Sequence, residues 1–407
     1  MIVFRIRATA IVAVGLLVSV ALSACGGSIA ATSTIASSLP VGTATPASAS
    51  TAKPSLASTL TTASAGATTA PSSTTAASSA PAIAASTTAS AAKPSGPADT
   101  VKVVHVPGLF FAPLYVAMDR GFFKDQNIEI SLDKAASGSE VMAFLAQGQI
   151  DVGAVGLSAA TFNTFAKGFD FKVIASAGIA PQKDGPSKFE VRKALVDGGQ
   201  VKTLADLKGK KVAVAGGTGS AGAYLAVKAL QTAGLTGKDV QFVNLANPDM
   251  VQALANGAVD AALIGTPFST QAIQQGAGAI LVDDFAPGYS TTTFMYSGKL
   301  IKERPDVANR FALALLKGYR AIQGANYLTD ANVQTYVKYT GSTEQVIRAT
   351  PPFIYDPNMA IKTDSITDQE KVYRENGWTD YSQPVDISKL FDPSFADKAV
   401  KTVGPAA

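Results

Sequence analysis

Apolar runs and amphipathic stretches alternate along the chain from residue 101, and this alternation predicts strands followed by helices. The first strands are expected at 101–106, 128–132, 150–155 and 171–176. Helices are expected between them at 113–120, 140–146 and 158–166, each followed by a glycine that ends it. Because a strand–helix–strand order gives parallel neighbours, the pattern predicts an α/β fold with mainly parallel, doubly wound sheets.

The same order repeats after Lys210, so we expect two similar α/β lobes. Residues 140–151 align with residues 249–260 without a gap, including identical glycines at 148 and 257. Asp151 and Asp260 also match, but each opens a strand. The amino end of a parallel strand points away from the crevice where such sheets bind ligands. A catalytic role for these two aspartates is therefore not expected.

A glycine-rich turn joins the strand expected at 211–215 to the helix expected at 220–233. Free backbone N–H groups and the helix dipole make such a turn suited to an anionic or polar ligand. The alternative interpretation of this segment is a tight turn that binds no ligand. On the first interpretation, Gly219→Val blocks the ligand and leaves stability almost unchanged.

Gly217-Thr-Gly219-Ser-Ala-Gly222 also fits the dinucleotide fingerprint G-x-G-x-x-G. That interpretation requires an acidic residue at the end of the next strand, where the chain has Asn244-Leu-Ala-Asn247. We therefore favour a small ligand over a dinucleotide.

The first residues predict export. Arg5 and Arg7 precede an apolar stretch at 8–22, and Leu22-Ser-Ala-Cys25-Gly26 resembles a bacterial lipobox. Cys25 is the only cysteine. We expect residues 1–25 to be a lipoprotein signal ending at a lipidated Cys25, with an ordinary secretory signal as the alternative.

Residues 26–100 consist mostly of Ala, Ser, Thr and Pro, a composition that cannot bury enough apolar surface to order itself. We expect a disordered tether that holds a globular body at the outer face of the cell membrane. The net charge of +4 and scattered lysines show no basic stripe, so nucleic acid is not expected as a partner.

Four segments then carry a family resemblance: Gly121-Phe-Phe-Lys, Gly148-Gln-Ile-Asp-Val-Gly153, the run from Thr203 to Val214, and the run from Gly257 to Phe268. Their order and spacing resemble the solute-binding lipoproteins of ABC importers. The most similar branch binds nitrate, sulfonates, taurine and thiamine pyrimidine precursors. The resemblance covers nearly all of residues 101–330.

The resemblance implies a periplasmic-binding-protein-like fold of two α/β lobes joined by crossover strands, near 189–192 and 291–297. Residues 101–185 and 291–407 would form the first lobe and residues 186–290 the second. It further implies a small polar or anionic ligand between the lobes, an ABC permease as partner, no cofactor and no enzyme activity. A monomer is expected.

Carried over by position, the resemblance implies a set of ligand-binding residues on loops and helix starts. In the first lobe these are Phe110, Phe111, Ser139, Ser158 and Thr161. In the second they are Thr218, Gly219, Ser220, Tyr224, Thr266 and Phe268. For Phe110, Phe111 and Tyr224, packing inside the lobe is the alternative.

His105, the only histidine, is expected either as a hydrogen-bonded residue at the end of a strand or as a pocket residue. With no second histidine and no clustered carboxylates, a metal site is not expected. Two other function classes stay open: an enzyme of the related pyrimidine-synthase type, and a binding module that signals to a membrane sensor.

Cys25→Ser tests the lipobox. Because the thiol is the group that accepts the lipid, we expect the variant to leave the membrane fraction and appear in the soluble one. Fractionation followed by immunoblotting measures this. Retention of the variant in membranes at the level of the unchanged chain would contradict lipid anchoring at Cys25.

Overall fold

The computed structural model describes residues 96–406 of the chain, and every structural statement below concerns this range. The expected signal, the lipidated Cys25 and nearly all of the expected tether lie outside the described residues. Within the range, no helix combines the length and apolarity that crossing a membrane requires.

Five strands form the first sheet, and four of them run parallel. Their order across the sheet is β2 (Ile128–Lys134), β1 (Asp99–His105), β3 (Val152–Gly156), β10 (Thr292–Ser297) and β4 (Phe171–Ser176). β10 runs antiparallel to both β3 and β4. It comes from a distant part of the chain and closes the sheet between two strands of the first repeat.

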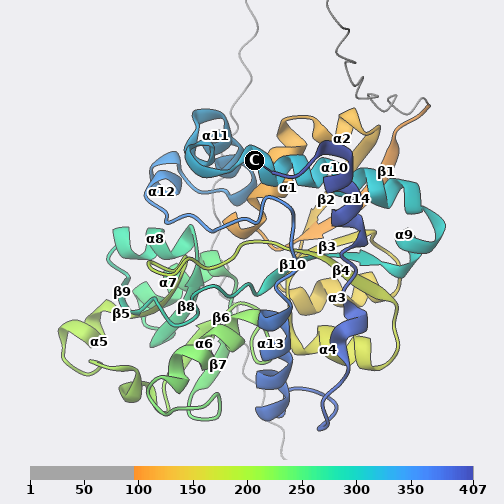
Figure 1. The fold of residues 1–407 in the computed structure, drawn as a ribbon. Coiled ribbons are helices and arrows are strands. Elements are labelled where there is room, and N and C mark those ends of the chain that lie inside the picture. The colour runs from red at the N-terminus through yellow and green to blue at the C-terminus, as the bar shows by residue number, and fades with distance from the viewer. Residues whose placement is uncertain (1–95, 407) are drawn as a thin grey trace, which may run out of the picture. The chain divides into compact units, whose positions relative to one another are not determined.

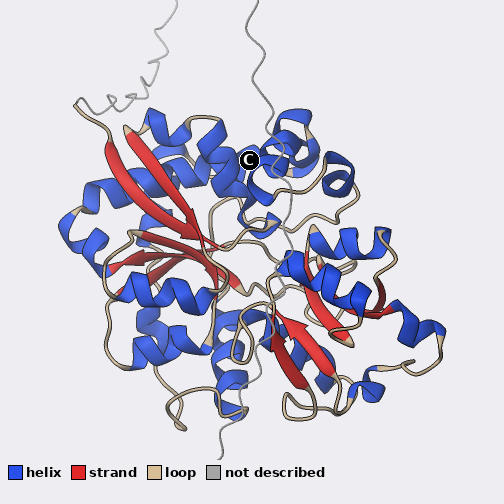
Figure 2. Ribbon diagram, turned by 180° about the vertical axis from the view of Figure 1, so that it is seen from behind, coloured by secondary structure: helices blue, strands red, loops and turns tan. Residues whose placement is uncertain are grey.

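The second sheet has the same plan. Its order is β7 (Gln241–Asn244), β6 (Lys211–Val214), β8 (Ala261–Gly265), β5 (Ser187–Arg192) and β9 (Gly278–Val282). β5 is the antiparallel strand, between β8 and β9. Each sheet thus takes one antiparallel strand from a crossover, and Figure 2 shows the two sheets with helices around them.

Helices cover both faces of each sheet (Figure 1). Around the first sheet these are α1 (Ala112–Asp119), α2 (Phe122–Asp125), α3 (Gly138–Ala146), α4 (Ala159–Ala166), α9 (Gly298–Glu303), α10 (Pro305–Ala321), α11 (Asp330–Thr340), α12 (Glu344–Arg348) and α14 (Ser394–Val403). Around the second they are α5 (Lys193–Asp197), α6 (Ala221–Gln231), α7 (Asn247–Asn256) and α8 (Phe268–Gln274).

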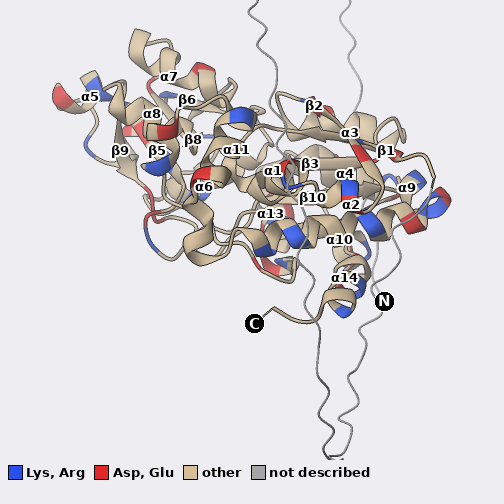
Figure 3. Cartoon of the chain, turned by 90° about the horizontal axis from the view of Figure 1, so that it is seen from above, with Lys and Arg blue, Asp and Glu red and all other residues tan. Residues whose placement is uncertain are grey.

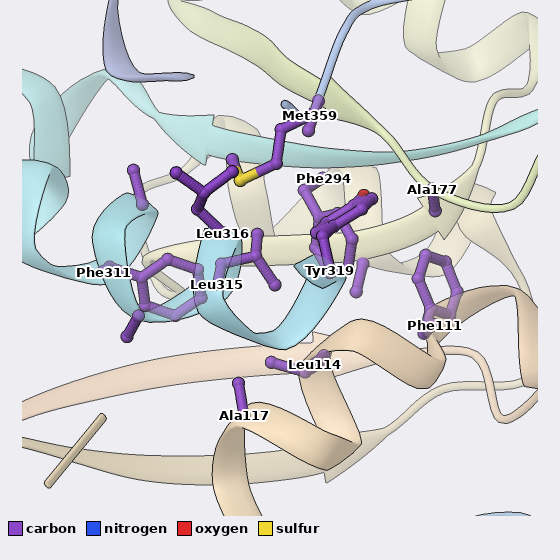
Figure 4. Packing of buried hydrophobic residues seen from close by; sticks show 14 of the residues in the cluster. Phe111, Leu114, Ala117, Ala177, Phe294, Phe311, Leu315, Leu316, Tyr319 and Met359 are labelled. Carbon is purple, nitrogen blue, oxygen red and sulfur yellow. The ribbon is translucent and has the colours of Figure 1, made fainter. Parts of the chain in front are cut away.

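The largest apolar cluster lies where α1 and α10 pack on the first sheet. Phe111, Phe294 and Tyr319 are fully buried there, and Figure 4 shows their side chains gathered beside Leu315 of α10. Burial of whole aromatic side chains contributes roughly 1.5–3 kcal/mol each, so this cluster fixes the loop that begins α1.

Two chain segments join the sheets and lie against each other. Ala180 N–H donates to Tyr289 O at 2.8 Å, and Gly288 N–H donates to Ala180 O at 2.9 Å. These bonds pair the connection that leads into β5 with the connection that leads into β10. The two sheets are therefore joined by a pair of hydrogen-bonded segments that lie side by side.

A third link is α13 (Thr363–Glu375), which contacts elements of both sheets. Tyr373 Oη donates to Leu157 O beside the first sheet. Asp368 accepts from Tyr224 Oη at 2.5 Å and pairs with Lys228 Nζ at 3.2 Å, both on α6 of the second sheet. The predicted division places α13 with the first lobe alone, whereas its contacts bridge the two.

The predicted α/β fold class is confirmed, and each expected strand is present within two residues at either end. Crossovers expected near 189–192 and 291–297 correspond to β5 and β10. The strands and helices are predictable here because glycines end the helices and apolar runs are buried on both faces.

Glu190 is an ionisable residue buried in the core of the second sheet, where the Ser269 hydroxyl and the charge of Lys188 offset its burial only in part. Its side chain is fully buried on β5, and neither carboxylate oxygen has a hydrogen-bond partner in the described range. Burial raises the pKa of Glu190 from 4.5 to about 7. The folded state therefore prefers the protonated carboxyl.

Glu190→Gln should remove a pH-dependent loss of stability. The folded pKa lies above the unfolded one, so this group's contribution is fully present below pH 4.5 and is lost as pH rises through about 7. At pH 8 the variant should be about 2–3 kcal/mol more stable than the unchanged chain, and the two should converge near pH 4. Urea unfolding across pH measures this. Equal stability of the two chains at pH 8 would contradict a strained buried carboxylate.

Candidate functional site

A cavity of about 110 Å³ lies between the carboxyl ends of strands from the two sheets. From the first-sheet side it is lined by Val106, Phe110, Ala136, Ser137, Gly138, Gly156, Ser158, Gly178, Thr291, Thr292 and Phe353. From the second-sheet side it is lined by Ser187, Ala215, Ser220, Ala221, Gly222, Leu225, Asn247, Leu263 and Gly265. The paired connections supply Ala180, Pro181, Gly185, Pro186, Asp283, Asp284, Phe285, Ala286, Pro287 and Tyr289. The volume compares with the ~150 Å³ cavity that holds one benzene, so it suits a small molecule.

Four helices begin at this cavity. The lining includes the N-caps of α3, α4 and α6, which are Ser137, Ser158 and Ser220, and the first residue of α7, Asn247. Each helix has eight residues or more, so its N-terminal amides carry partial positive charge. The first amides of α6, at Ala221 and Gly222, line the cavity and by position have no intrahelical partner.

Two lining residues, Thr292 and Asn247, carry polar side chains. Thr292 is 8 % exposed, and its Oγ1 has no partner among residues 96–406. Asn247 Oδ1 accepts from Gly265 N–H at 3.2 Å, so this oxygen already has a partner in the wall. A buried hydroxyl without a partner costs about 1–3 kcal/mol, and Thr292 carries that cost in this structure.

The remaining wall is aromatic and lacks basic residues. Phe110, Phe285, Tyr289 and Phe353 line it, with the Phe110 and Phe353 rings at 6.0 Å in an edge-to-face arrangement. No lysine or arginine of the described range is among the lining residues, although basic and acidic residues are interspersed elsewhere (Figure 3).

Three of the predicted ligand-binding residues line the cavity: Phe110, Ser158 and Ser220. Ser139 is half-buried beside the lining residue Gly138, and Thr161 is buried behind Ser158, whose N–H donates to Thr161 Oγ1 at 3.2 Å. Thr266 is buried away from the lining, and Thr218 is exposed.

Phe111, Tyr224 and Phe268 belong to apolar cores instead. Phe111 packs edge-on against Phe294 at 5.4 Å. Tyr224 directs its hydroxyl to Asp368 of α13, and burial raises the pKa of Tyr224 far above its usual value. For Phe111 and Tyr224 the structure favours the packing alternative, and Phe268, expected only as a ligand-binding residue, also lies in an apolar core.

The glycine turn contacts the other sheet rather than presenting all its amides to a ligand. Gly219 O accepts from Ala159 N–H, the first amide of α4, at 2.7 Å. Gly216 N–H donates to Asn244 Oδ1 at 2.9 Å. A Cβ on Gly219 would lie 3.1 Å from that of Ala159, so the expectation that Gly219→Val leaves stability unchanged is corrected.

His105 is fully buried and organises the loop that carries Phe110. Its Nδ1 lies 2.8 Å from Tyr115 Oη, which also accepts from Gly108 N–H at 3.4 Å. Burial, and to a smaller extent the charge of Lys134, lowers the pKa of His105 to about 4, so the ring is neutral at physiological pH. The hydrogen-bonded interpretation of His105 fits this placement.

Sequence reasoning missed Asn247, Thr292, Phe353 and the aspartates of the β9–β10 connection. Asn247 and Asp283 each follow a parallel strand, and the rule that ligands bind at carboxyl ends would have found both. Thr292 and Phe353 lie on a crossover strand and on a late segment, where no repeat marks them.

The family model described as NMT1/THI5 like matches residues 110–325, which is more than half of the 407 residues. A protein of Escherichia coli (strain K12), described provisionally as an aliphatic sulfonates-binding protein, is 34% identical over 155 residues. That match covers 38% of this chain and 46% of the relative, so the chain spans about half the length of this curated relative.

Two solved structures share the fold. The alkanesulfonate-binding protein from Xanthomonas axonopodis pv. citri, bound to MOPS, superposes with a TM-score of 0.58 at 17% identity, over 71% of this chain and 96% of that one. The periplasmic nitrate-binding protein from Synechocystis PCC 6803 gives 0.61 at 15% identity, over 75% and 89%. At these identities the likeness establishes the periplasmic-binding-protein fold.

A pair of glycine substitutions tests the role of the turn. Gly219 has a φ of +76°, so Gly219→Ala adds left-handed strain and a close contact with Ala159. We expect a loss of about 1–3 kcal/mol in the free energy of unfolding. Gly265→Ala is the control, because its Cβ would meet atoms no closer than 3.7 Å and the expected change is within about 0.5 kcal/mol. Equal stability of the two variants in urea unfolding would show that the Gly219 contact is absent in solution.

Proposed function

Because the chain belongs to the NMT1/THI5-like family, we propose that it is an extracytoplasmic solute-binding protein that captures a small organic molecule and delivers it to an ABC permease. The observation that carries this proposal is the small cavity at the carboxyl ends of two sheets, where four helix N-termini meet. Crevices at the carboxyl ends of the strands are the usual ligand sites of open α/β sheets.

The lining favours a small polar or anionic organic ligand, with sulfonate, carboxylate and pyrimidine-like molecules as candidates. Amides at the starts of α3 and α6 can donate to an acceptor group, and Thr292 adds a hydroxyl. Aromatic walls suit a flat or short apolar body. These are the features expected of a site that holds one orientation of a small molecule.

We take residues 101–185 with 291–407 as one lobe and 186–290 as the other, and the lobes close on the ligand. The bond from Ala159 N–H to Gly219 O, together with the 3.0 Å contact between the Thr270 and Thr350 hydroxyls, joins residues assigned to different lobes. A ligand that touches both lobes favours closure only through the extra contacts of the closed form.

The location and partners follow from the first hundred residues and from the family. We propose that residues 1–25 are a lipoprotein signal and that Cys25 carries the lipid. Residues 26–100 then act as a tether at the extracytoplasmic face of the cell membrane. The protein works as a monomer, with a permease as its protein partner and without nucleic acid.

Binding fits the lining better than catalysis does. Among the lining residues of the described range there is no cysteine, histidine or lysine, so the groups that a pyrimidine-synthase-like reaction would use are not gathered there. We therefore propose that the chain is not an enzyme. A ligand-sensing module remains the second candidate, since it would use the same closure to signal.

Native mass spectrometry of protein purified without refolding tests the proposal, because a closed cavity retains its ligand. We expect a bound small organic molecule of low mass. Small-angle scattering after the ligand is removed and restored should then give a smaller radius of gyration with ligand than without.

Thr292→Val provides the matched test of the site, with Thr232→Val on the outer end of α6 as control. Loss of one hydrogen bond should weaken binding of the retained molecule by about 0.5–1.5 kcal/mol in the Thr292 variant alone. A radius that is unchanged at saturation, or equal affinity in both variants, would contradict capture in this cavity.

A further inference from the structure

We propose that Asp368 is a positioning residue outside the cavity, whose carboxylate fastens α13 to α6 and so sets how firmly the two sheets stay together. The contact of Asp368 with Tyr224 and Lys228 of α6 is called the latch below. The inference rests on the proposed closure of the two lobes and adds a residue that controls it. Its basis is the unequal attachment of α13 to the two sheets.

The attachment of α13 to the first sheet, and to the connection before β10, uses backbone atoms. Tyr373 Oη donates to Leu157 O at 2.9 Å, just after β3. Ser290 N–H, in that connection, donates to Ser365 Oγ at 3.2 Å, and Gln369 Nε2 donates to Ser290 O at 3.1 Å. All five residues are buried, so breaking these bonds would leave polar groups without partners. We therefore expect α13 to move with the first sheet.

The hydrogen bonds from α13 to the second sheet, within residues 96–406, are made by side chains and centre on Asp368. Its carboxylate accepts from Tyr224 Oη at 2.5 Å and pairs with Lys228 Nζ at 3.2 Å. Tyr224 and Lys228 are one turn apart on α6, so one carboxylate holds two points on the same helix face. The Asp368 side chain is 25 % exposed, so water can replace these partners when the contact separates.

The latch affects the cavity through α6. The cavity lining includes Ser220, Ala221 and Gly222, at the start of this helix, whereas Asp368 is not among the lining residues. Tyr224 lies in the same first turn of α6. Figure 1 shows α13 between α6 and α4, a helix of the first sheet. A carboxylate that holds Tyr224 therefore holds one wall of the cavity against the first sheet.

Trp378, which follows α13, reports on the same contact. It is the only tryptophan in the chain. Its ring lies 5.9 Å from that of Phe242 on β7, edge to face, and a Cβ on Gly219 would lie 3.6 Å from the Trp378 Cβ. Separation of α13 from the second sheet should expose this ring to water, which shifts its fluorescence emission to longer wavelength.

Asp368→Ala in the full mature chain, freed of retained solute, tests the latch, and Asp119→Ala is the matched control. Asp119 likewise accepts from a tyrosine hydroxyl, Tyr339 Oη at 3.0 Å, and pairs with a lysine, Lys338 Nζ at 2.6 Å. Both aspartate side chains are 25 % exposed. The partners of Asp119 lie on α11 beside the first sheet, so its contacts do not join the two sheets.

Two readouts distinguish a latch from a contact that only stabilises the fold. The Ala159 amide, which bonds across the two sheets, should exchange about tenfold faster in the Asp368 variant, because the sheets separate more often. Emission of Trp378 should shift to longer wavelength in that variant. The Asp119 variant should change neither readout, although both variants should unfold at lower urea concentration.

Tyr224→Phe and Lys228→Met each remove one partner of Asp368, and they keep the test available if Asp368→Ala does not fold. Each should speed exchange at Ala159 by about threefold, and Tyr224→Phe should add nothing to Asp368→Ala. Equal readouts in the Asp368 and Asp119 variants, no effect of either single-partner variant, or additive effects in the double variant would overturn the latch.

Failure of the latch would leave closure by a bound solute intact, because that closure concerns the difference between protein with and without solute. The proposed function fails on a separate result, namely that protein purified without refolding retains no small molecule.

Discussion

The close approach of the two sheets at three glycines is the constraint on which the site depends. A Cβ on Gly156 would lie 2.8 Å from the Cβ of Ala221, and one on Gly216 would lie 3.2 Å from that of Ser137. Gly219 makes the third approach, to Ala159. Side chains at these positions would hold the strand ends apart. The cavity has walls from both sheets because these glycines leave room for the small side chains of Ala221, Ser137 and Ala159 beside it.

The close approach brings the positive ends of four helix dipoles to one cavity, and carboxylates of the lining supply negative charge. Four helix N-termini concentrate partial positive charge at one cavity, which favours acceptor groups. The aspartates of the β9–β10 connection add negative charge to the same lining. A site built this way binds a small polar molecule through backbone amides, hydroxyls and carboxylates, without any basic side chain.

The sequence predicts the repeated framework well and the site only in part. Glycine-ended helices and apolar strands identify the repeated strands of both sheets because those signals are local, whereas β5 and β10 are expected only from the family resemblance. Ser158 and Ser220 are found because helix starts follow strand ends. Tyr224 is misplaced because its partner, Asp368, lies 144 residues away. Thr292 is missed because its position depends on the pairing of β10 with β3, a strand from a distant part of the chain. Such long-range placements leave no local pattern.

Hydrogen exchange at the Ala159 amide tests the central claim, that the ligand closes the two sheets on one another. This amide donates to Gly219 across the boundary, so its protection reports closure at a single bond. With the retained molecule at saturation, the account predicts markedly slower exchange at Ala159 than in the ligand-free protein, while the amide of Ala213 inside the second sheet changes little. Equal exchange at Ala159 with and without ligand would contradict closure and leave a rigid cavity as the better description.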